Sequence, residues 1–227
     1  MNWAYLRSAV RKPSLIFSMH LLRFFENKSG VIIGGRLRWH FKDLSRTVQK
    51  IINVDNRPAD IANHDVDYVT DAANLFFVAE ESLDFICSSH LLEHLANPLK
   101  AIAEWKRVIK EGGIIYVGVP DKRHTFDHKR DRTPLSHLID DFEKDVDQTD
   151  TTHIAEFIEK INENEPGDGN SEQSHGYVIE DPESTVHHHV WIADDVKEIF
   201  EYMGLAMPYK PIFRHGTIHI IAQKLKQ

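Results

Sequence analysis

The stretch GVIIGGRLRWHF, residues 30–41, has the pattern of a buried strand that runs into a glycine turn and then into a helix. Val31, Ile32 and Ile33 form a short β-branched run, which favours a strand. Gly34 and Gly35 follow it as a turn, and apolar residues then recur with helical spacing as far as Val48. A strand, a tight turn and a helix in this order are typical of parallel α/β sheets.

The same rhythm continues outward from this stretch. Five short apolar runs are followed by polar or glycine residues: VIIGG at 31–35, IINVDN at 51–56, DYVTDA at 67–72, LDFICSS at 83–89 and GIIYVGVP at 113–120. Before the last run, Asn97 is suited to cap a helix that begins at Pro98 and ends near Gly112. Towards the C-terminus we expect a helix in DDVKEIFEYMGL and an edge or antiparallel strand in GTIHIIAQKL. The sequence therefore predicts an α/β fold with a mostly parallel sheet covered on both faces.

Length, charge and cysteine content indicate a cytoplasmic protein of one domain. The 227 residues contain no run of about eighteen apolar residues, and the single cysteine, Cys87, cannot form an internal disulfide. The net charge is -8, yet residues 1–50 carry ten Lys or Arg against two Asp or Glu. This basic segment fits the solvated face of an N-terminal helix, or alternatively a contact with a membrane surface. The acidic remainder argues against a nucleic-acid partner.

Composition divides the chain into four segments. Residues 1–29 form an N-terminal helical extension, and residues 30–120 form the first half of the sheet. Residues 121–190 hold eighteen Asp or Glu and eight of the fifteen histidines, which marks an acidic, His-rich insertion that we expect to act as a lid over the acceptor. Residues 191–227 return to the domain with a helix and the closing strands.

Polar residues end each of the five predicted strands. They are Gly34-Gly35, Asp55-Asn56, Asp71-Ala72, Ser88-Ser89-His90 and Pro120-Asp121. Because ligands of open parallel sheets bind beyond the carboxyl ends of the strands, these residues form a candidate site. Asp55 lies twenty residues after Gly35, where a carboxylate is placed to accept hydrogen bonds from a ribose, although an ordinary Asp-Asn turn is the alternative.

The segments VDN at 54–56, TDAANLFF at 70–77, SLDFICSSHLLEHLANPLKAIAEWKRVIKEGG at 82–113 and IIYVGVPD at 114–121 resemble the class I S-adenosylmethionine-dependent methyltransferases, in particular their type 11 small-molecule branch. The resemblance implies a Rossmann-like fold with a mostly parallel seven-stranded sheet, and S-adenosylmethionine as cofactor. It implies that Gly34 and Gly35 approach the methionine portion and that Asp55, with Asn56 beside it, holds the ribose. Asp71 and Ala72 would bracket the adenine, while Ser88 and His90 would line the sulfonium side.

The opening stretch departs from the family pattern. Members of the family carry an acidic residue before a G-x-G-x-G turn, whereas this chain has Ile32-Ile33-Gly34-Gly35-Arg36. Two functions therefore stay open. One is methyl transfer to oxygen, and the other is a catalytically inactive binding or regulatory protein that keeps the methyltransferase fold without the full glycine cradle.

The segment after the fifth strand, PDKRHTFDHKRDRTPLSHL, supplies the candidate catalytic residues. His124 is placed to deprotonate a hydroxyl, with Asp121 orienting it, although His124 would equally cap a loop or pair with Asp127. The D-x-R-H pattern is similar to that of methyltransferases in surface-polysaccharide clusters, which implies O-methylation of a sugar or sugar-linked precursor in polysaccharide biosynthesis. The acceptor's identity and the oligomeric state stay open.

The run VHHHVWI, residues 186–192, is the one sequence feature that suggests a metal. On a strand, His187 and His189 would face one side and His188 the other, so at most two could bind one ion, with Asp121, His124 or His128 completing the set. Packing or substrate contact is the commoner role for such histidines, and we assign no metal ligand. The motifs Y-x-x-x-K, G-x-S-x-G and G-x-x-x-x-G-K-[ST] are absent, which argues against a short-chain dehydrogenase, an α/β-hydrolase and a P-loop NTPase.

Overall fold

The computed structural model describes residues 24–35, 48–62, 65–162 and 186–226. The five predicted strands are all present, as β1 (Ser29–Ile33), β2 (Lys50–Asp55), β3 (Tyr68–Val69), β4 (Leu83–Ser89) and β5 (Ile109–Pro120). The later strands are β6 (Leu205–Ala206), β7 (Ile212–Arg214) and β8 (Thr217–Lys224). The helices are α4 (Ala59–Ala62), α5 (Pro98–Val108), α6 (Leu135–Glu143), α7 (Thr152–Asn162) and α10 (Ala193–Tyr202), with short 3-10 helices η1 (Leu92–His94), η2 (Lys122–His124) and η3 (Phe126–Lys129).

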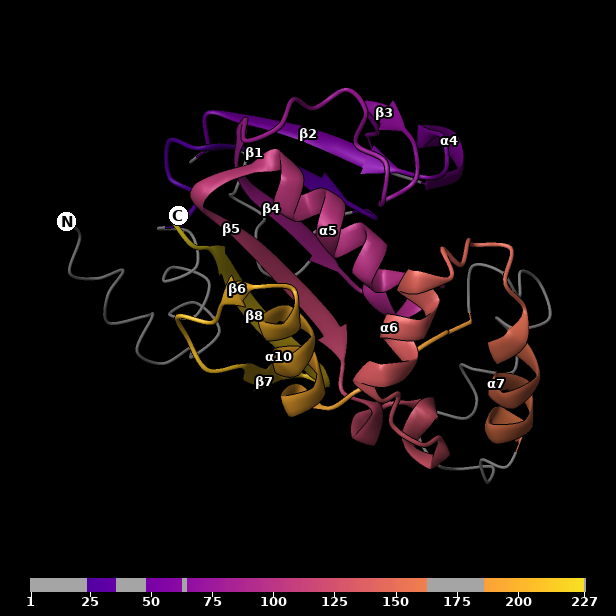
Figure 1. Ribbon diagram of the computed structural model, residues 1–227. Coiled ribbons are helices and arrows are strands. Elements are labelled where there is room, and N and C mark those ends of the chain that lie inside the picture. Colours follow the sequence, from indigo (N-terminus) through magenta and orange to yellow (C-terminus); the bar gives the residue numbers. More distant parts are fainter. Residues whose placement is uncertain (1–23, 36–47, 63–64, 163–185, 227) are drawn as a thin grey trace, which may run out of the picture.

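All strands belong to one sheet of the order β3-β2-β1-β4-β5-β8-β6, with β7 also paired to β8 (Figure 1). The ladders among β1 to β5 are parallel, and the three ladders of β8 are antiparallel. The sheet is therefore parallel in its first half, as expected, but within the described residues it has eight strands rather than seven. The predicted C-terminal strand is antiparallel, yet β8 lies inside the sheet because β6 and β7 cover its outer side.

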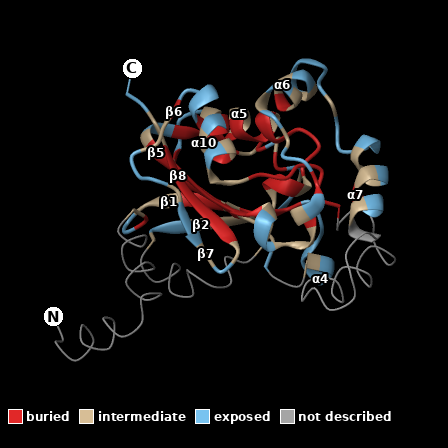
Figure 2. Cartoon of the chain, turned by 90° about the horizontal axis from the view of Figure 1, so that it is seen from below, coloured by how far each residue is buried: buried red, intermediate tan, exposed pale blue. Residues whose placement is uncertain are grey.

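Apolar side chains alternate between the two faces of the sheet, as the period of a strand requires. One face packs Ile86, Val117 and Ile220 against α5, α6 and α10, and this is the larger core. The other face packs Phe85 and Tyr116 against Phe24, Phe25 and Val48. Buried residues accordingly run through the central strands, as Figure 2 shows in red. The helices predicted over residues 1–29 and 37–48 fall almost entirely outside the described residues.

Helix α5 begins as the sequence predicts, but it ends earlier. The Asn97 side chain accepts a hydrogen bond from the Lys100 amide at 3.0 Å, and Pro98 is the first helical residue. The helix ends at Val108 because Ile109 already has the extended backbone of β5. Gly112, predicted to end the helix, lies inside β5 with φ of +74°, so it serves an irregularity of the strand instead.

The predicted insertion leaves and rejoins the sheet at one place. Asp121 forms a parallel bridge with Trp191, and the Lys122 amide donates to the Trp191 carbonyl at 3.0 Å. Between these points, α6 packs on α5 through the buried Leu138, while α7 lies farther from the sheet (Figure 1). Within the described part of the chain, no helix is long and apolar enough to cross a bilayer.

Candidate functional site

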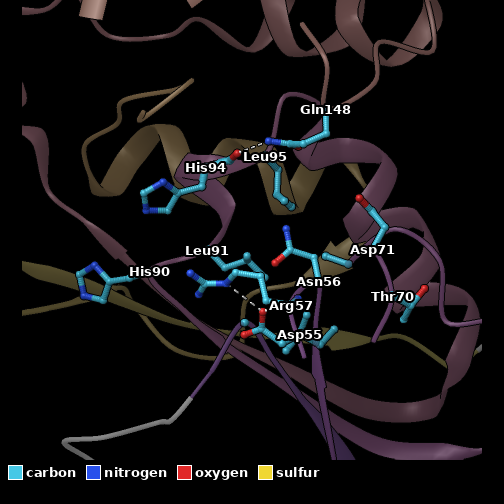
Figure 3. Close-up of a pocket in the computed structure, with 13 residues that line it drawn as sticks. Asp55, Asn56, Arg57, Thr70, Asp71, His90, Leu91, His94, Leu95 and Gln148 are labelled. Atoms are coloured by element: carbon cyan, nitrogen blue, oxygen red, sulfur yellow. Dashed lines mark hydrogen bonds and ion pairs between the residues drawn. The ribbon is translucent and has the colours of Figure 1, made fainter. Parts of the chain in front are cut away.

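A cavity of about 220 Å³ opens where β1, β2, β3 and β4 end. Six predicted site residues line it: Gly34, Asp55, Asn56, Asp71, Ala72 and His90. Further lining residues are Ile33, Arg57, Thr70, Leu91, His94, Leu95 and Gln148 (Figure 3). The structure thus brings together residues from four strand ends that are far apart in the sequence, which is the arrangement that parallel sheets use for ligands.

The two-glycine turn gives the cavity one wall of bare backbone. Gly34 and Gly35 have φ values of +76° and +103°, which L side chains rarely adopt. The Gly34 amide donates to the Val54 carbonyl of β2 at 2.9 Å. A Cβ atom at Gly34 would lie 3.0 Å from the Leu91 side chain. Gly34 therefore satisfies both a backbone and a packing requirement, whereas Gly35 is not among the lining residues.

Asp55 ends β2 and presents a buried carboxylate to the cavity. Its Oδ1 accepts a hydrogen bond from the Arg57 amide at 3.0 Å and from Arg57 Nε at 3.4 Å. The Arg57 side chain is 47 % exposed. It can therefore move away from Asp55 into solvent, where its charge stays hydrated. The turn proposed as an alternative is thus real, but it leaves the carboxylate facing the cavity beside Asn56 (Figure 3).

Helix α5 fixes the segment that holds Asp71 and Ala72. The buried Trp105 donates its indole hydrogen to the Ala72 carbonyl at 2.9 Å. Glu104 accepts from the Leu75 amide at 2.9 Å. Asp71 itself accepts from the Ala73 amide at 2.6 Å, which closes a tight turn. Because α5 is rigid and buried, these bonds set where the third strand end meets the cavity.

Behind the cavity lies a buried carboxylate surrounded by imidazoles. Both oxygens of Glu93 are inaccessible and without a hydrogen-bond partner in the described residues. Nδ1 of His90 lies 3.4 Å from Glu93 Oε1, and Nε2 of His94 lies 3.9 Å from it. Burial raises the pKa of Glu93, but the neighbouring imidazoles have the larger effect and bring this pKa below its usual range. His94 also lines the cavity, so this group of side chains borders the candidate site.

Glu93 sets the properties of His90. Burial lowers the pKa of His90, but the neighbouring carboxylate brings it above its ordinary value. The backbone of His90 is in the left-handed region, with φ of +53°, and Nε2 of its ring lies 3.2 Å from the Thr217 hydroxyl. His90 is thus a half-exposed imidazole with a carboxylate at one nitrogen, which is the arrangement of an oriented base.

Ser88 lies two residues before His90, and, unlike the prediction, it does not line the cavity. Its hydroxyl is buried inside the sheet, without a hydrogen-bond partner in the described residues, and Ser88 is not among the lining residues. Ser88 is covered because it lies in a central strand, where it pairs with Ile33 of β1 on one side and with Val117 of β5 on the other.

The predicted pair of Asp121 and His124 is not a dyad in this structure. The Asp121 carboxylate accepts from Arg123 Nε at 2.9 Å and from Arg123 Nη2 at 2.6 Å, and it caps η2. Burial raises the pKa of Asp121, but the Arg123 guanidinium brings it below its usual range. His124 is exposed and packs on Phe213, with ring centroids 4.6 Å apart. Sequence spacing misled here because η2 turns the two side chains towards different neighbours.

Gln148, from the insertion, closes the cavity on the side of His94. Its amide donates to the His94 carbonyl at 2.7 Å and accepts from the Ala96 amide at 3.1 Å (Figure 3). A second cavity of about 340 Å³ adjoins the first and shares Asp71, Leu95 and Gln148 with it. The role of Gln148 could not be predicted from the sequence, since a polar residue in a polar segment carries no local signal of its partner.

The histidine run does not behave as a strand. His187 donates from Nδ1 to the Asp127 carboxylate at 2.5 Å, whereas the His189 ring lies near Asp141, with Nε2 3.9 Å from Oδ2. Their two side chains therefore enter different clusters, and do not lie on one side of a strand as the alternation of a strand would require. The segment is irregular because its backbone bonds to the turn after β4, through the His189 amide and the Glu93 carbonyl at 3.3 Å.

Comparison with known proteins agrees with this geometry. Residues 33–117 match the sequence model of a family described as a methyltransferase domain. An S-adenosylmethionine-dependent methyltransferase from Aquifex aeolicus has a similar fold, with a TM-score of 0.53 and 15% identity over 91% of this chain and 87% of that one. A Thermotoga maritima structure, whose description is an S-adenosylmethionine-dependent methyltransferase and possible histamine N-methyltransferase, has a TM-score of 0.54 and 17% identity, over 97% of this chain and 95% of that one.

No curated protein sequence matches this chain significantly. The solved structures, at these identities, establish the fold, and the family match begins at the end of β1 and covers β2, β3 and β4. The match at residues 33–117 and this sheet order give the chain the fold of S-adenosylmethionine-dependent methyltransferases.

Proposed function

We propose that this protein binds S-adenosylmethionine in the cavity at the strand ends and methylates a hydroxyl group of a small molecule of the sugar class. The observation that carries the proposal is the convergence of Gly34, Asp55, Asp71 and His90 on one cavity within the matched domain. The sugar class rests on the resemblance at Asp121–His124, and the hydroxyl on the presence of an oriented imidazole.

The lining residues fit the proposed cofactor. Gly34 has no side chain, so the cofactor can approach its backbone closely. The Asp55 carboxylate is placed to accept hydrogen bonds from two ribose hydroxyls once the Arg57 side chain moves away. Ala72 and Leu95 offer apolar surface for the adenine beside the polar Asp71. Ile33 stands in the cavity wall where the family pattern has an acid. Bound S-adenosylmethionine supplies an electrophilic methyl group.

The chain's own contribution to catalysis is a base. We assign this role to His90, whose Nε2 would take the acceptor's proton while Glu93 stabilises the imidazolium that forms. The exposed His124, predicted from the sequence, stays a candidate. Loss of a general base costs about 10²-fold or more in rate, so His90→Gln should lower kcat at least that far, while His124→Gln tests the sequence prediction in parallel.

Calorimetric titration with S-adenosylmethionine and S-adenosylhomocysteine tests cofactor binding first. We expect micromolar affinity and a loss of about 10- to 100-fold in Asp55→Asn, which keeps the side-chain shape but removes the charge-assisted bonds. Asp60→Asn, on the exposed α4, serves as the control. No binding at millimolar ligand would favour the inactive binding protein.

A second assay tests the acceptor class separately. Formation of S-adenosylhomocysteine is measured with free and nucleotide-linked hexoses. Methylation of a hexose hydroxyl is the expected result. Cofactor binding with turnover of amine acceptors alone would reject the hydroxyl acceptor while leaving the methyltransferase intact.

A further inference from the structure

Four metal-ligating side chains converge outside the strand-end cavity. His137 and Asp141 lie on α6, His153 lies at the start of α7, and His189 comes from the irregular segment before β-bridge residue Trp191. Their ligand atoms all lie within 4.8 Å of one another. The helix places His137 and Asp141 on one face because they are four residues apart.

The closest atoms have the spacing of ligands around one ion. Nε2 of His137 lies 3.0 Å from Nε2 of His153 and 3.2 Å from Oδ2 of Asp141, and Nε2 of His189 lies 3.9 Å from the same oxygen. Ligands at zinc distances in a tetrahedron are about 3.4 Å apart, which these values bracket. Without an ion, the two imidazole nitrogens of His137 and His153 can form a hydrogen bond only if one of them carries a proton.

Two buried atoms of the cluster also lack hydrogen-bond partners among the described residues. They are Oδ2 of Asp141 and Nδ1 of His189, whose side chain is completely buried. Nε2 of His189 meets the Ala96 carbonyl at 3.2 Å, so ligation would require the ring proton to move from Nε2 to the unpartnered Nδ1. Buried polar atoms without partners are uncommon and call for an explanation.

The chemistry of the four ligands indicates which metal ions the cluster suits. Neutral imidazole nitrogens with one carboxylate suit zinc and other first-row transition ions rather than magnesium or calcium.

We propose that His137, Asp141, His153 and His189 form a binding site for one transition-metal ion of the zinc class. The ion would join α6, α7 and the segment 186–190, three parts of the insertion. Of these, α7 and the segment already share a small apolar cluster around Phe157 and Val186. It would also link the insertion to the start of α5, because the Asn97 side chain donates to the Asp141 carbonyl at 3.0 Å. This inference is independent of the acceptor and of the proposed base.

Another group, Glu93, His94 and His187, offers only three ligands. There His187 is already bonded to Asp127, and the Glu93 charge is balanced by His90 as well as by the two other imidazoles. The cluster on α6 and α7 offers a complete tetrahedral set, so we favour it.

Metal binding is tested on the full chain with Zn²⁺ alone. The chelator-treated protein is titrated with Zn²⁺ by calorimetry, and the bound metal is counted by mass spectrometry after dialysis. We expect one tightly bound ion. His153→Gln and Asp141→Asn should each weaken binding by more than about 100-fold, since even outer partners of metal ligands contribute 10- to 100-fold.

His188→Gln is the matched control, because His188 is a buried neighbour outside the ligand set. Circular dichroism verifies that each variant is folded. The proposal is overturned if the folded wild-type protein binds no zinc at micromolar concentration, or if His153→Gln binds it as wild type does. Loss of binding in His187→Gln but not in His153→Gln would assign the ion to the group around Glu93 instead.

Discussion

A substitution at the single residue Gly34 tests whether the shortened glycine turn is adapted to a ligand. Replacing it by alanine forces a side chain into φ of +76° and places Cβ 3.0 Å from Leu91. We expect a loss of about 1–2 kcal/mol in unfolding free energy and weaker binding of S-adenosylhomocysteine by calorimetry. Gly112→Ala is the control: its φ is +74°, but its Cβ would meet only Lys226, at 3.8 Å. Equal effects of the two changes on affinity would exclude a role of Gly34 in binding.

Glu93 allows a second test, of the oriented base. The carboxylate raises the pKa of His90, so His90 becomes an active base only as pH rises through a value above about 6.5. Glu93→Gln removes the charge and keeps the shape, and His90 should then lose its proton at lower pH. We therefore expect the acidic limb of the kcat/KM profile to move to lower pH, with a reduced plateau. An unmoved limb would mean that His90 is not the titrating base.

At the scale of elements, α5 supports the cofactor site as well as the core. Trp105→Phe leaves the buried Ala72 carbonyl without its donor, which costs about 1–3 kcal/mol. We expect weaker binding of S-adenosylhomocysteine as well, because Ala72 lines the cavity. Trp191→Phe is the matched control, since the Trp191 indole nitrogen is buried without a hydrogen-bond partner in the described residues. The prediction fails if both variants bind equally well.

A buried ion pair joins η3 to the histidine segment. Arg130 donates to Asp127 at 3.0 Å and to the His187 carbonyl at 2.6 Å, and both charged side chains are about 1% exposed. Arg130→Met leaves Asp127 without this cation, so we expect a loss of about 3–5 kcal/mol in chemical denaturation at pH 7. Arg132→Met is the control, because Arg132 is half exposed beside Asp195 and should cost about 1 kcal/mol or less.

The same pair gives a pH dependence. Burial raises the pKa of Asp127, but its bonds to His187 and Arg130 bring it below the ordinary value. A depressed carboxyl pKa stabilises the fold above the unfolded value of about 3.9, and this stabilisation is lost as pH falls through the folded value. The difference between wild type and Arg130→Met should therefore narrow below about pH 4. A constant difference would show that Asp127 is not the group involved.

The elements were more predictable than the contacts between them. β-Branched runs and the Asn97-Pro98 start fixed where β1, β2, β4 and α5 begin, because these signals are local in sequence. Asp55 and Asp71 followed from the rule that parallel strands end at one edge. The Glu93–His90 pair is local, three residues apart, but the burial of Glu93 depends on the whole fold. Gln148 depends on contacts with His94 and Ala96, which are far away in the sequence. His187 and His189 were misjudged because their segment bonds to the turn after β4 rather than to a strand.

At the scale of the whole molecule, the insertion and the sheet share one ligand cavity. Gln148 makes this link, because it lines the cavity and bonds to the backbone of His94 and Ala96. Ligand binding should therefore stabilise both parts together. S-adenosylhomocysteine at 100 times its Kd should raise the unfolding free energy by about 2.7 kcal/mol, which corresponds to a Tm increase of about 5–10 °C for a chain of this size.

Gln148→Ala should weaken this coupling without unfolding the protein. If the variant binds about tenfold more weakly, the same ligand concentration stabilises it by only about 1.4 kcal/mol. Differential scanning calorimetry with and without ligand measures the difference. Gln223→Ala is the matched control, because Gln223 also donates to a backbone carbonyl, that of Gly112 at 2.9 Å, but lies away from the cavity. A full ligand-induced shift in Gln148→Ala would show that the sheet alone holds the cofactor and that the insertion serves only the acceptor.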